Sequence, residues 1–140
     1  MSFLQVIDEY LEMFNEGDGD NALHGLLEMG PAILPELISA YRSEADRQNR
    51  HFLLHVIWEY REPSMIPFLS EVLLDSEPLF WKEALDGLVA IALPDAMNAL
   101  CDARSRRFTR ASDSETFQLW LEEAIEQVSL STSSLDQLFN

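Results

Sequence analysis

The chain has 140 residues and a mass of 16.0 kDa, which is a typical size for one domain. Asp and Glu outnumber Lys and Arg by 25 to 9, so the formal net charge is −16 and the isoelectric point is about 4.3. Such a charge argues against binding to nucleic acid or to an anionic membrane, because both carry negative charge themselves. The single cysteine, Cys101, excludes an internal disulfide and a zinc site made of cysteines.

The N-terminal segment lacks the features of a secretion signal. Its first five residues include no Lys or Arg, and Asp8 and Glu9 follow soon after. The sequence also has no apolar run of about 18 residues, the length that a membrane-spanning helix needs. We therefore expect a soluble, cytoplasmic protein that does not interact with membranes.

Apolar residues recur at helical spacing along most of the chain, beginning with Phe3, Ile7 and Leu11, and strand signals are nearly absent. Gly and Pro residues separate the apolar stripes. We expect an all-α fold of eight helices, paired as four hairpins. The first helices of the pairs are expected at 2–15, 32–43, 64–74 and 95–107, and the second helices at 20–29, 47–61, 79–92 and 114–129.

Several residues suit the expected helix ends. Pro63, Pro78 and Pro94 fit the first turn of a helix, where no backbone N–H is needed. The hydroxyl of Ser112 or Ser114 is expected to cap the last helix.

The hairpins resemble one another in sequence, with a period of about 31 residues. The hexapeptide at 22–27 (ALHGLL) and the one at 84–89 (ALDGLV) differ at two positions. A shift of 31 residues aligns Leu54 with Leu85, and a shift of 36 aligns Leu85 with Leu121. The chain therefore reads as a set of stacked near-copies, each of which cannot bury its apolar stripes alone.

The repeat resembles the HEAT-repeat family. The segments that carry the resemblance are 31–38 (PAILPELI) and 64–69 (SMIPFL), each followed by an acidic turn and a helix with a small-Leu-x-x-Leu core. The resemblance implies a short right-handed αα-solenoid of about four HEAT-like hairpins, forming a single domain over 1–130 with a polar C-terminal tail at 131–140. The Asp/Arg pair that HEAT repeats often carry is matched by Asp46 and Arg47 alone. The alternative is an irregular eight-helix bundle.

Charged residues recur at equivalent positions of the second helices. The alignment places His24, His55, Asp86 and Glu122 together, and Glu28, Glu59 and Glu126 follow four residues after three of them, on the same helix face. We expect these residues to form an acidic stripe, which the HEAT resemblance places on the concave side. The alternative is a solvated face that only maintains solubility.

Tryptophan is the residue type most suited to anchor such an interface. Trp81 follows two apolar residues at a helix start and is the candidate anchor if it is partly exposed; the alternative, favoured for each tryptophan, is that it packs in the core. Trp58 is expected in the core, and Trp120 at an edge.

The sequence offers little catalytic or metal-binding chemistry. His51 and His55, with Glu59 one turn further, have a spacing that zinc can use, but Phe52 replaces the Glu of the zincin pattern. We expect surface histidines, no metal, no cofactor and no catalytic residues. Cys101 is expected to pack in the core. The cluster of Arg104, Arg106, Arg107 and Arg110 is expected to complement the dipole at the end of the seventh helix.

The function expected from these features is non-catalytic binding of a basic protein. Small acidic helical-repeat proteins of this kind are similar to immunity proteins of bacterial toxin–immunity pairs, which implies a basic cognate toxin, possibly a nuclease, as the partner. Two alternatives remain: a HEAT-type scaffold or adaptor, and a bilin lyase, because HEAT-like repeats also occur in that class. The oligomeric state is left open, and 131–140 is either a frayed end, a last helical turn or a docking peptide.

Overall fold

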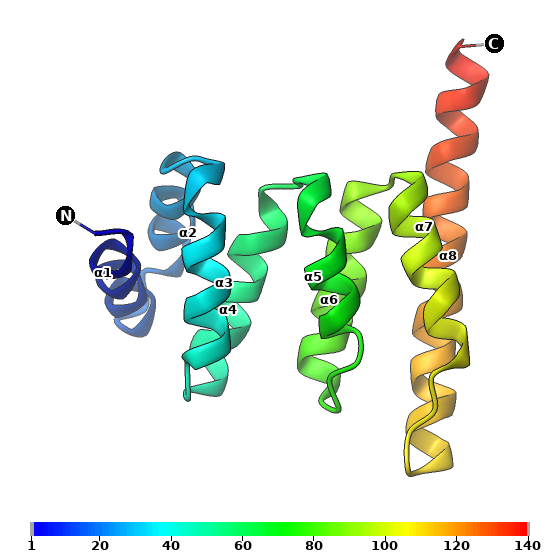
Figure 1. Cartoon of the computed structure of the whole chain (residues 1–140), viewed down its shortest axis with the longest axis horizontal. Coiled ribbons are helices and arrows are strands. Elements are labelled where there is room, and N and C mark those ends of the chain that lie inside the picture. Colours follow the sequence, from blue (N-terminus) through cyan, green and yellow to red (C-terminus); the bar gives the residue numbers. More distant parts are fainter. Residues whose placement is uncertain (1, 140) are drawn as a thin grey trace. The chain divides into compact units, whose positions relative to one another are not determined.

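The computed structural model describes the backbone of residues 2–139 and the side chains of residues 2–132. In this part of the chain eight α-helices alternate with short turns and three 3-10 helices, and there is no strand (Figure 1). The all-α fold and the eight helices are therefore confirmed. The chain forms two compact units, Met1–Tyr60 and Arg61–Asn140, and each is described by itself.

The first unit contains two helical hairpins. Its elements are α1 (Phe3–Asn15), α2 (Gly19–Glu28), the 3-10 helix η1 (Pro31–Ile33), α3 (Leu34–Ser43) and α4 (Arg47–Glu59). Within each hairpin the helices pack together, α1 with α2 and α3 with α4, and α1 also packs on α3 and α2 on α4. Gly17 and Gly30 end the first two helices with φ angles of 92° and 86°, in the left-handed region that favours glycine.

Two close contacts join helices inside the first unit. The ring of Tyr10 on α1 lies against the backbone of Gly25 on α2, where an added Cβ would sit 2.3 Å from the ring. The hydroxyl of Tyr60, just after α4, donates a hydrogen bond to the carbonyl of Leu26. The same carbonyl accepts from the backbone N–H of Met29, at 3.2 Å, so Tyr60 is its second donor and joins the end of α4 to that of α2.

The second unit repeats the same pattern of contacts. Its elements are the 3-10 helix η2 (Pro63–Met65), α5 (Ile66–Val72), α6 (Pro78–Ile91), α7 (Pro94–Asp102), the 3-10 helix η3 (Ala103–Ser105) and α8 (Ala111–Phe139). The hairpin partners α5 and α6 pack together, as do α7 and α8, and α5 also packs on α7 and α6 on α8.

The helix starts agree with the prolines. Pro63, Pro78 and Pro94 each occupy the first position of η2, α6 and α7, as expected. The predicted segment 64–74 is shorter as an α-helix, because η2 forms its first turn and α5 ends at Val72.

The last helix differs most from the prediction. It begins at Ala111 rather than 114, and it continues past the predicted end at 129, through Phe139. The expectation that Ser112 or Ser114 caps this helix is wrong. The hydroxyl of Ser114 instead accepts a hydrogen bond from the backbone N–H of Phe108, at 2.8 Å.

Among the helices of the described residues, none is both long enough and apolar enough to cross a bilayer.

Candidate functional site

In the first unit, four predicted residues lie on the second helices of the hairpins. His24 and Glu28 are exposed on α2, and His55 and Glu59 are half-buried on α4. The Nε2 atom of His55 is 3.9 Å from Oε1 of Glu59, and its ring meets Trp58 edge-on, with centroids 5.1 Å apart. Trp58 is 9% exposed, which confirms its place in the core.

The half-buried positions of α4 form a narrow stripe. Six apolar residues of α4 are buried: Phe52, Leu53, Leu54, Val56, Ile57 and Trp58. His51, His55 and Glu59, spaced four residues apart, remain partly open to solvent. Because residues at this spacing share a helix face, the predicted His55 and Glu59 lie together on the open side of α4.

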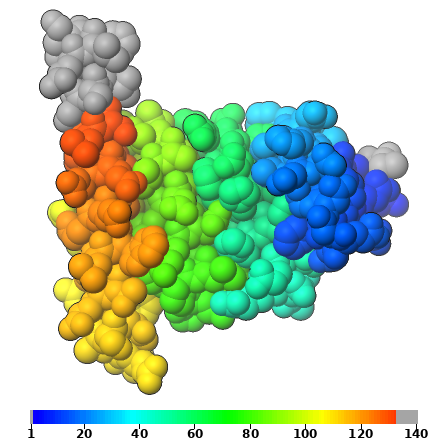
Figure 2. Space-filling view, turned by 180° about the vertical axis from the view of Figure 1, so that it is seen from behind, coloured from blue at the N-terminus to red at the C-terminus, as the bar shows by residue number. Residues whose placement is uncertain are grey.

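In the second unit, α6 and α8 lie side by side, on the face that Figure 2 shows. Between them lies a shallow depression of about 60 Å³. It is lined by Leu85, Asp86, Val89, Trp120, Glu123, Ala124 and Gln127. The predicted Asp86 is exposed at this depression, and its carboxylate neighbour across the helix pair is Glu123 rather than Glu122.

Glu122 belongs to a different contact. Its two carboxylate oxygens accept hydrogen bonds from Nε and a terminal nitrogen of Arg104, at 2.8 and 3.1 Å. This contact holds the pKa of the Glu122 carboxyl below its ordinary value, mainly through the hydrogen bond from Arg104; desolvation acts in the opposite direction, and the charge of Arg104 adds a smaller lowering. Glu122 is therefore neutralised by the segment that follows α7. Glu126, one turn further along α8, is exposed.

Glu123 lies at the depression in place of the predicted Glu122 because the alignment of the repeats is shifted by one residue from the predicted one. Among the side chains of α8 that the structure describes, the buried ones are Phe117, Leu121, Ala124, Ile125 and Val128. A shift of 37 residues, rather than 36, aligns all five with buried residues of α6: Phe80, Ala84, Gly87, Leu88 and Ile91. Successive residues of an α-helix are about 100° apart around its axis, so a change of one residue in the alignment selects a different helix face. With the shift of 37, Glu123 is the equivalent of Asp86.

Trp81 does not serve as an exposed anchor, which corrects that expectation. It is 1% exposed and packs edge-on against Phe117, with ring centroids 5.1 Å apart, and 6.4 Å from the ring of Phe108. Trp120 is instead the exposed tryptophan, at 41%. The side-chain ammonium of Lys82 lies 4.4 Å from the centre of the Trp120 ring and 5.7 Å from that of Trp81.

The arginine cluster has structural partners. Arg106 donates hydrogen bonds to the backbone carbonyls of Leu73 and Asp75, the second at 2.8 Å, and its guanidinium stacks 4.0 Å from the centre of the Phe108 ring. These carbonyls follow the end of α5, so Arg106 caps α5 rather than α7. Burial is the main cause that lowers the pKa of the Arg106 guanidinium.

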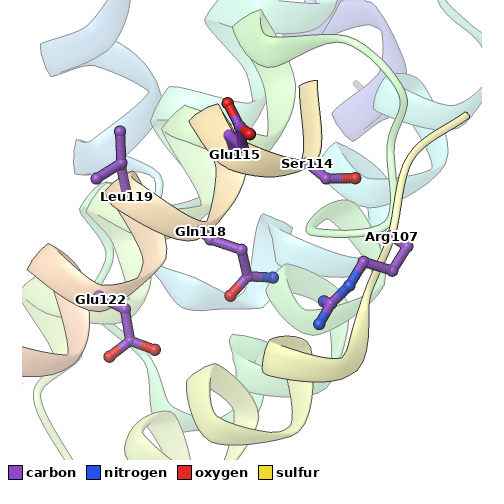
Figure 3. A pocket seen from close by; sticks show the side chains of 6 residues that line it. All are labelled: Arg107, Ser114, Glu115, Gln118, Leu119 and Glu122. Carbon is purple, nitrogen blue, oxygen red and sulfur yellow. The ribbon is translucent and has the colours of Figure 1, made fainter. Parts of the chain in front are cut away.

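A larger groove of about 550 Å³ lies beside the first half of α8 (Figure 3). It is lined by Arg107, Ser114, Glu115, Gln118, Leu119 and Glu122. Its polar groups are largely occupied by the chain itself. Arg107 donates to the carbonyls of Arg104 and Arg106 at 2.8 Å, and the Gln118 amide donates to the same two carbonyls at 3.2 and 3.3 Å.

The described residues contain no group of three or more His, Cys, Asp or Glu side chains placed to hold a metal ion. Cys101 is a free thiol and is half-buried, so it is less enclosed than expected.

No protein-family model matches the chain, and comparisons with curated proteins and with solved structures also found no match.

Proposed function

We propose that the protein is a non-catalytic module that binds a basic protein through the open sides of its second helices. The carboxylates concerned are Glu28 and Glu59 in the first unit and Asp86 and Glu123 in the second, and we call them the acidic faces. The observation that supports this most strongly is the charge: a net −16 exceeds what solubility requires. An acidic surface attracts basic partners over long distances and speeds their association.

The finer assignment is an immunity protein of a bacterial toxin–immunity pair, in the cytoplasm, which binds and neutralises a basic toxin such as a nuclease. Its support is the HEAT-like repeat in an acidic chain of this size. The contacts inside each unit, first helix on first helix and second on second, support the proposal of a short αα-solenoid. We propose that the four hairpins continue this arrangement as one domain over 1–130. A scaffold that assembles basic proteins without inhibiting them is the second candidate.

The test is capture from the native host at low salt. Two triple variants with the same change in net charge are compared with the unchanged chain. The first reverses Glu59→Lys, Asp86→Lys and Glu123→Lys on the acidic faces. The second reverses Glu9→Lys, Glu12→Lys and Asp102→Lys, all exposed on the first helices α1 and α7.

We expect the unchanged chain and the second variant to retain the same basic protein, and the first variant to lose it. The captured protein is then purified and its activity measured with and without the chain. Inhibition supports the immunity assignment, and binding without inhibition supports the scaffold. Equal retention by both triple variants would show that the acidic faces are not the binding surface.

A further inference from the structure

The surface between α6 and α8 combines an open aromatic ring with carboxylates. Trp120 is 41% exposed, whereas Trp58 and Trp81 are 9% and 1% exposed. Trp120 lines the depression of about 60 Å³ together with Asp86, Glu123 and Gln127. Asp86 and Glu123 are both exposed. An aromatic face beside carboxylates is the arrangement that recognises a cationic side chain.

The chain places a cation of its own on this ring. Lys82, the only lysine in the sequence, holds its ammonium 4.4 Å from the centre of the Trp120 ring. Lys82 and Asp86 are four residues apart on α6, so they share the face that borders the depression. The contact shows that the Trp120 ring accommodates a positive charge.

We propose that this depression receives an arginine side chain of the basic partner, which stacks on Trp120 between Asp86 and Glu123 and displaces Lys82. The proposal rests on the proposed function, because it names the side chain that one acidic face recognises. A guanidinium is planar and weakly hydrated, so it stacks on indole and also pairs in bidentate fashion with a carboxylate. The ammonium of Lys82 offers only a point charge. Arginine is therefore favoured over lysine at this position.

The proposal predicts opposite effects for two neighbouring side chains. Removing the ring with Trp120→Leu weakens binding of an arginine-rich ligand. Removing the competing cation with Lys82→Met strengthens it, and also makes the face more acidic. The matched control is Leu119→Ala, because Leu119 is the preceding residue of α8 and is 73% exposed.

The test measures affinity for two fluorescent peptides, nona-arginine and nona-lysine, at low salt. The unchanged chain is expected to prefer nona-arginine by about two- to fivefold, the range that a cation–π contact at an exposed site supplies. Trp120→Leu removes this preference, Lys82→Met increases affinity for nona-arginine, and Leu119→Ala changes neither. Circular dichroism tests whether each variant is folded. If Trp120→Leu is not folded, Lys82→Met still provides the test.

A second measurement locates the contact. In a 15N-labelled sample, nona-arginine is expected to shift the indole N–H resonance of Trp120 more than that of Trp58, which is buried in the first unit. Suppose that both peptides bind and that reversal of the acidic faces abolishes this binding. If Trp120→Leu and Lys82→Met then leave the binding unchanged, this inference is overturned and the proposed function stands. Absence of salt-dependent binding to either peptide would overturn both.

Discussion

Arg106 shows how a single side chain acquires a role that its neighbours in sequence do not reveal. The residue lies beyond α7, and its position suggests a cap for that helix. Its hydrogen bonds go instead to the carbonyls of Leu73 and Asp75, more than thirty residues earlier, while its guanidinium stacks on Phe108. Helical periodicity contains no information about such a distant contact, so only the three-dimensional structure identifies it.

Replacing Arg106 is expected to destabilise the protein. Arg106→Met leaves two carbonyls without their donor, and hydrogen bonds from a charged group are each worth about 1.5–3 kcal/mol. Arg106→Lys keeps the charge but loses the planar stack, so its loss is intermediate. Urea unfolding followed by circular dichroism measures both. A free energy of unfolding for Arg106→Met equal to that of the unchanged chain would contradict the capping role.

The contact between Arg104 and Glu122 predicts a pH effect at one residue. Arg104 lowers the pKa of the Glu122 carboxyl, so the contact is fully formed above the ordinary pKa of Glu and is lost as the pH falls through the lowered value. Arg104→Gln is expected to move the Glu122 titration to higher pH. Carbon-13 NMR of the side-chain carboxyl measures this shift, by comparison of the Arg104→Gln variant with the unchanged chain. An unchanged Glu122 titration would contradict the contact.

At the scale of elements, the packing of α1 on α2 depends on a glycine. The Tyr10 ring fills the space where a side chain at position 25 would begin. Gly25→Ala gains about 1 kcal/mol of helix propensity but forces the ring to move, and overpacking of this kind costs about 1–3 kcal/mol. We expect a net loss of stability in urea unfolding.

A double-mutant cycle separates these two effects. In a Tyr10→Ala background the ring is gone, so Gly25→Ala is expected to stabilise the protein. If Gly25→Ala has the same effect with and without the Tyr10 ring, the close approach does not determine the packing of this hairpin.

The sequence predicted the helices well because they depend on local signals. Apolar spacing and prolines such as Pro78 and Pro94 place most boundaries within a few residues of the structure. The last helix was less predictable, because the connection before it, which contains η3, is longer than the corresponding connection in the other three hairpins. The predicted alignment of Leu85 with Leu121 was therefore wrong by one residue, and it selected Glu122 in place of Glu123.

The apolar pattern of the sequence contains the information that places both Trp81 and Glu123. Trp81, Leu85 and Leu88 follow the i, i+4, i+7 spacing of one buried face, which predicts Trp81 in the core. Aligning Phe80 with Phe117 gives the shift of 37 and selects Glu123. The pairing of Glu122 with Arg104 had no such signal, because it depends on how the chain crosses from α7 to α8.

At the scale of the whole molecule, charge is the feature on which the proposed function depends. The chain has 25 Asp and Glu residues but nine Lys and Arg residues, which gives a net charge of −16. Several of these basic residues are engaged inside the second unit: Arg104 with Glu122, and Arg106 and Arg107 with backbone carbonyls. Association of the acidic faces with the proposed basic partner should weaken steeply as salt increases, because salt screens the attraction between exposed charges.

The most direct measurement is the dissociation constant for nona-arginine at rising salt, from about 0.05 M to about 0.5 M, for the two triple charge-reversal variants. Both have the same net charge, so they differ only in where the carboxylates are lost. We predict that reversing Glu59, Asp86 and Glu123 weakens binding by about a hundredfold at low salt, while reversing Glu9, Glu12 and Asp102 weakens it by about fivefold or less. Equal losses in the two variants would show that only total charge matters, and would contradict binding through the acidic faces.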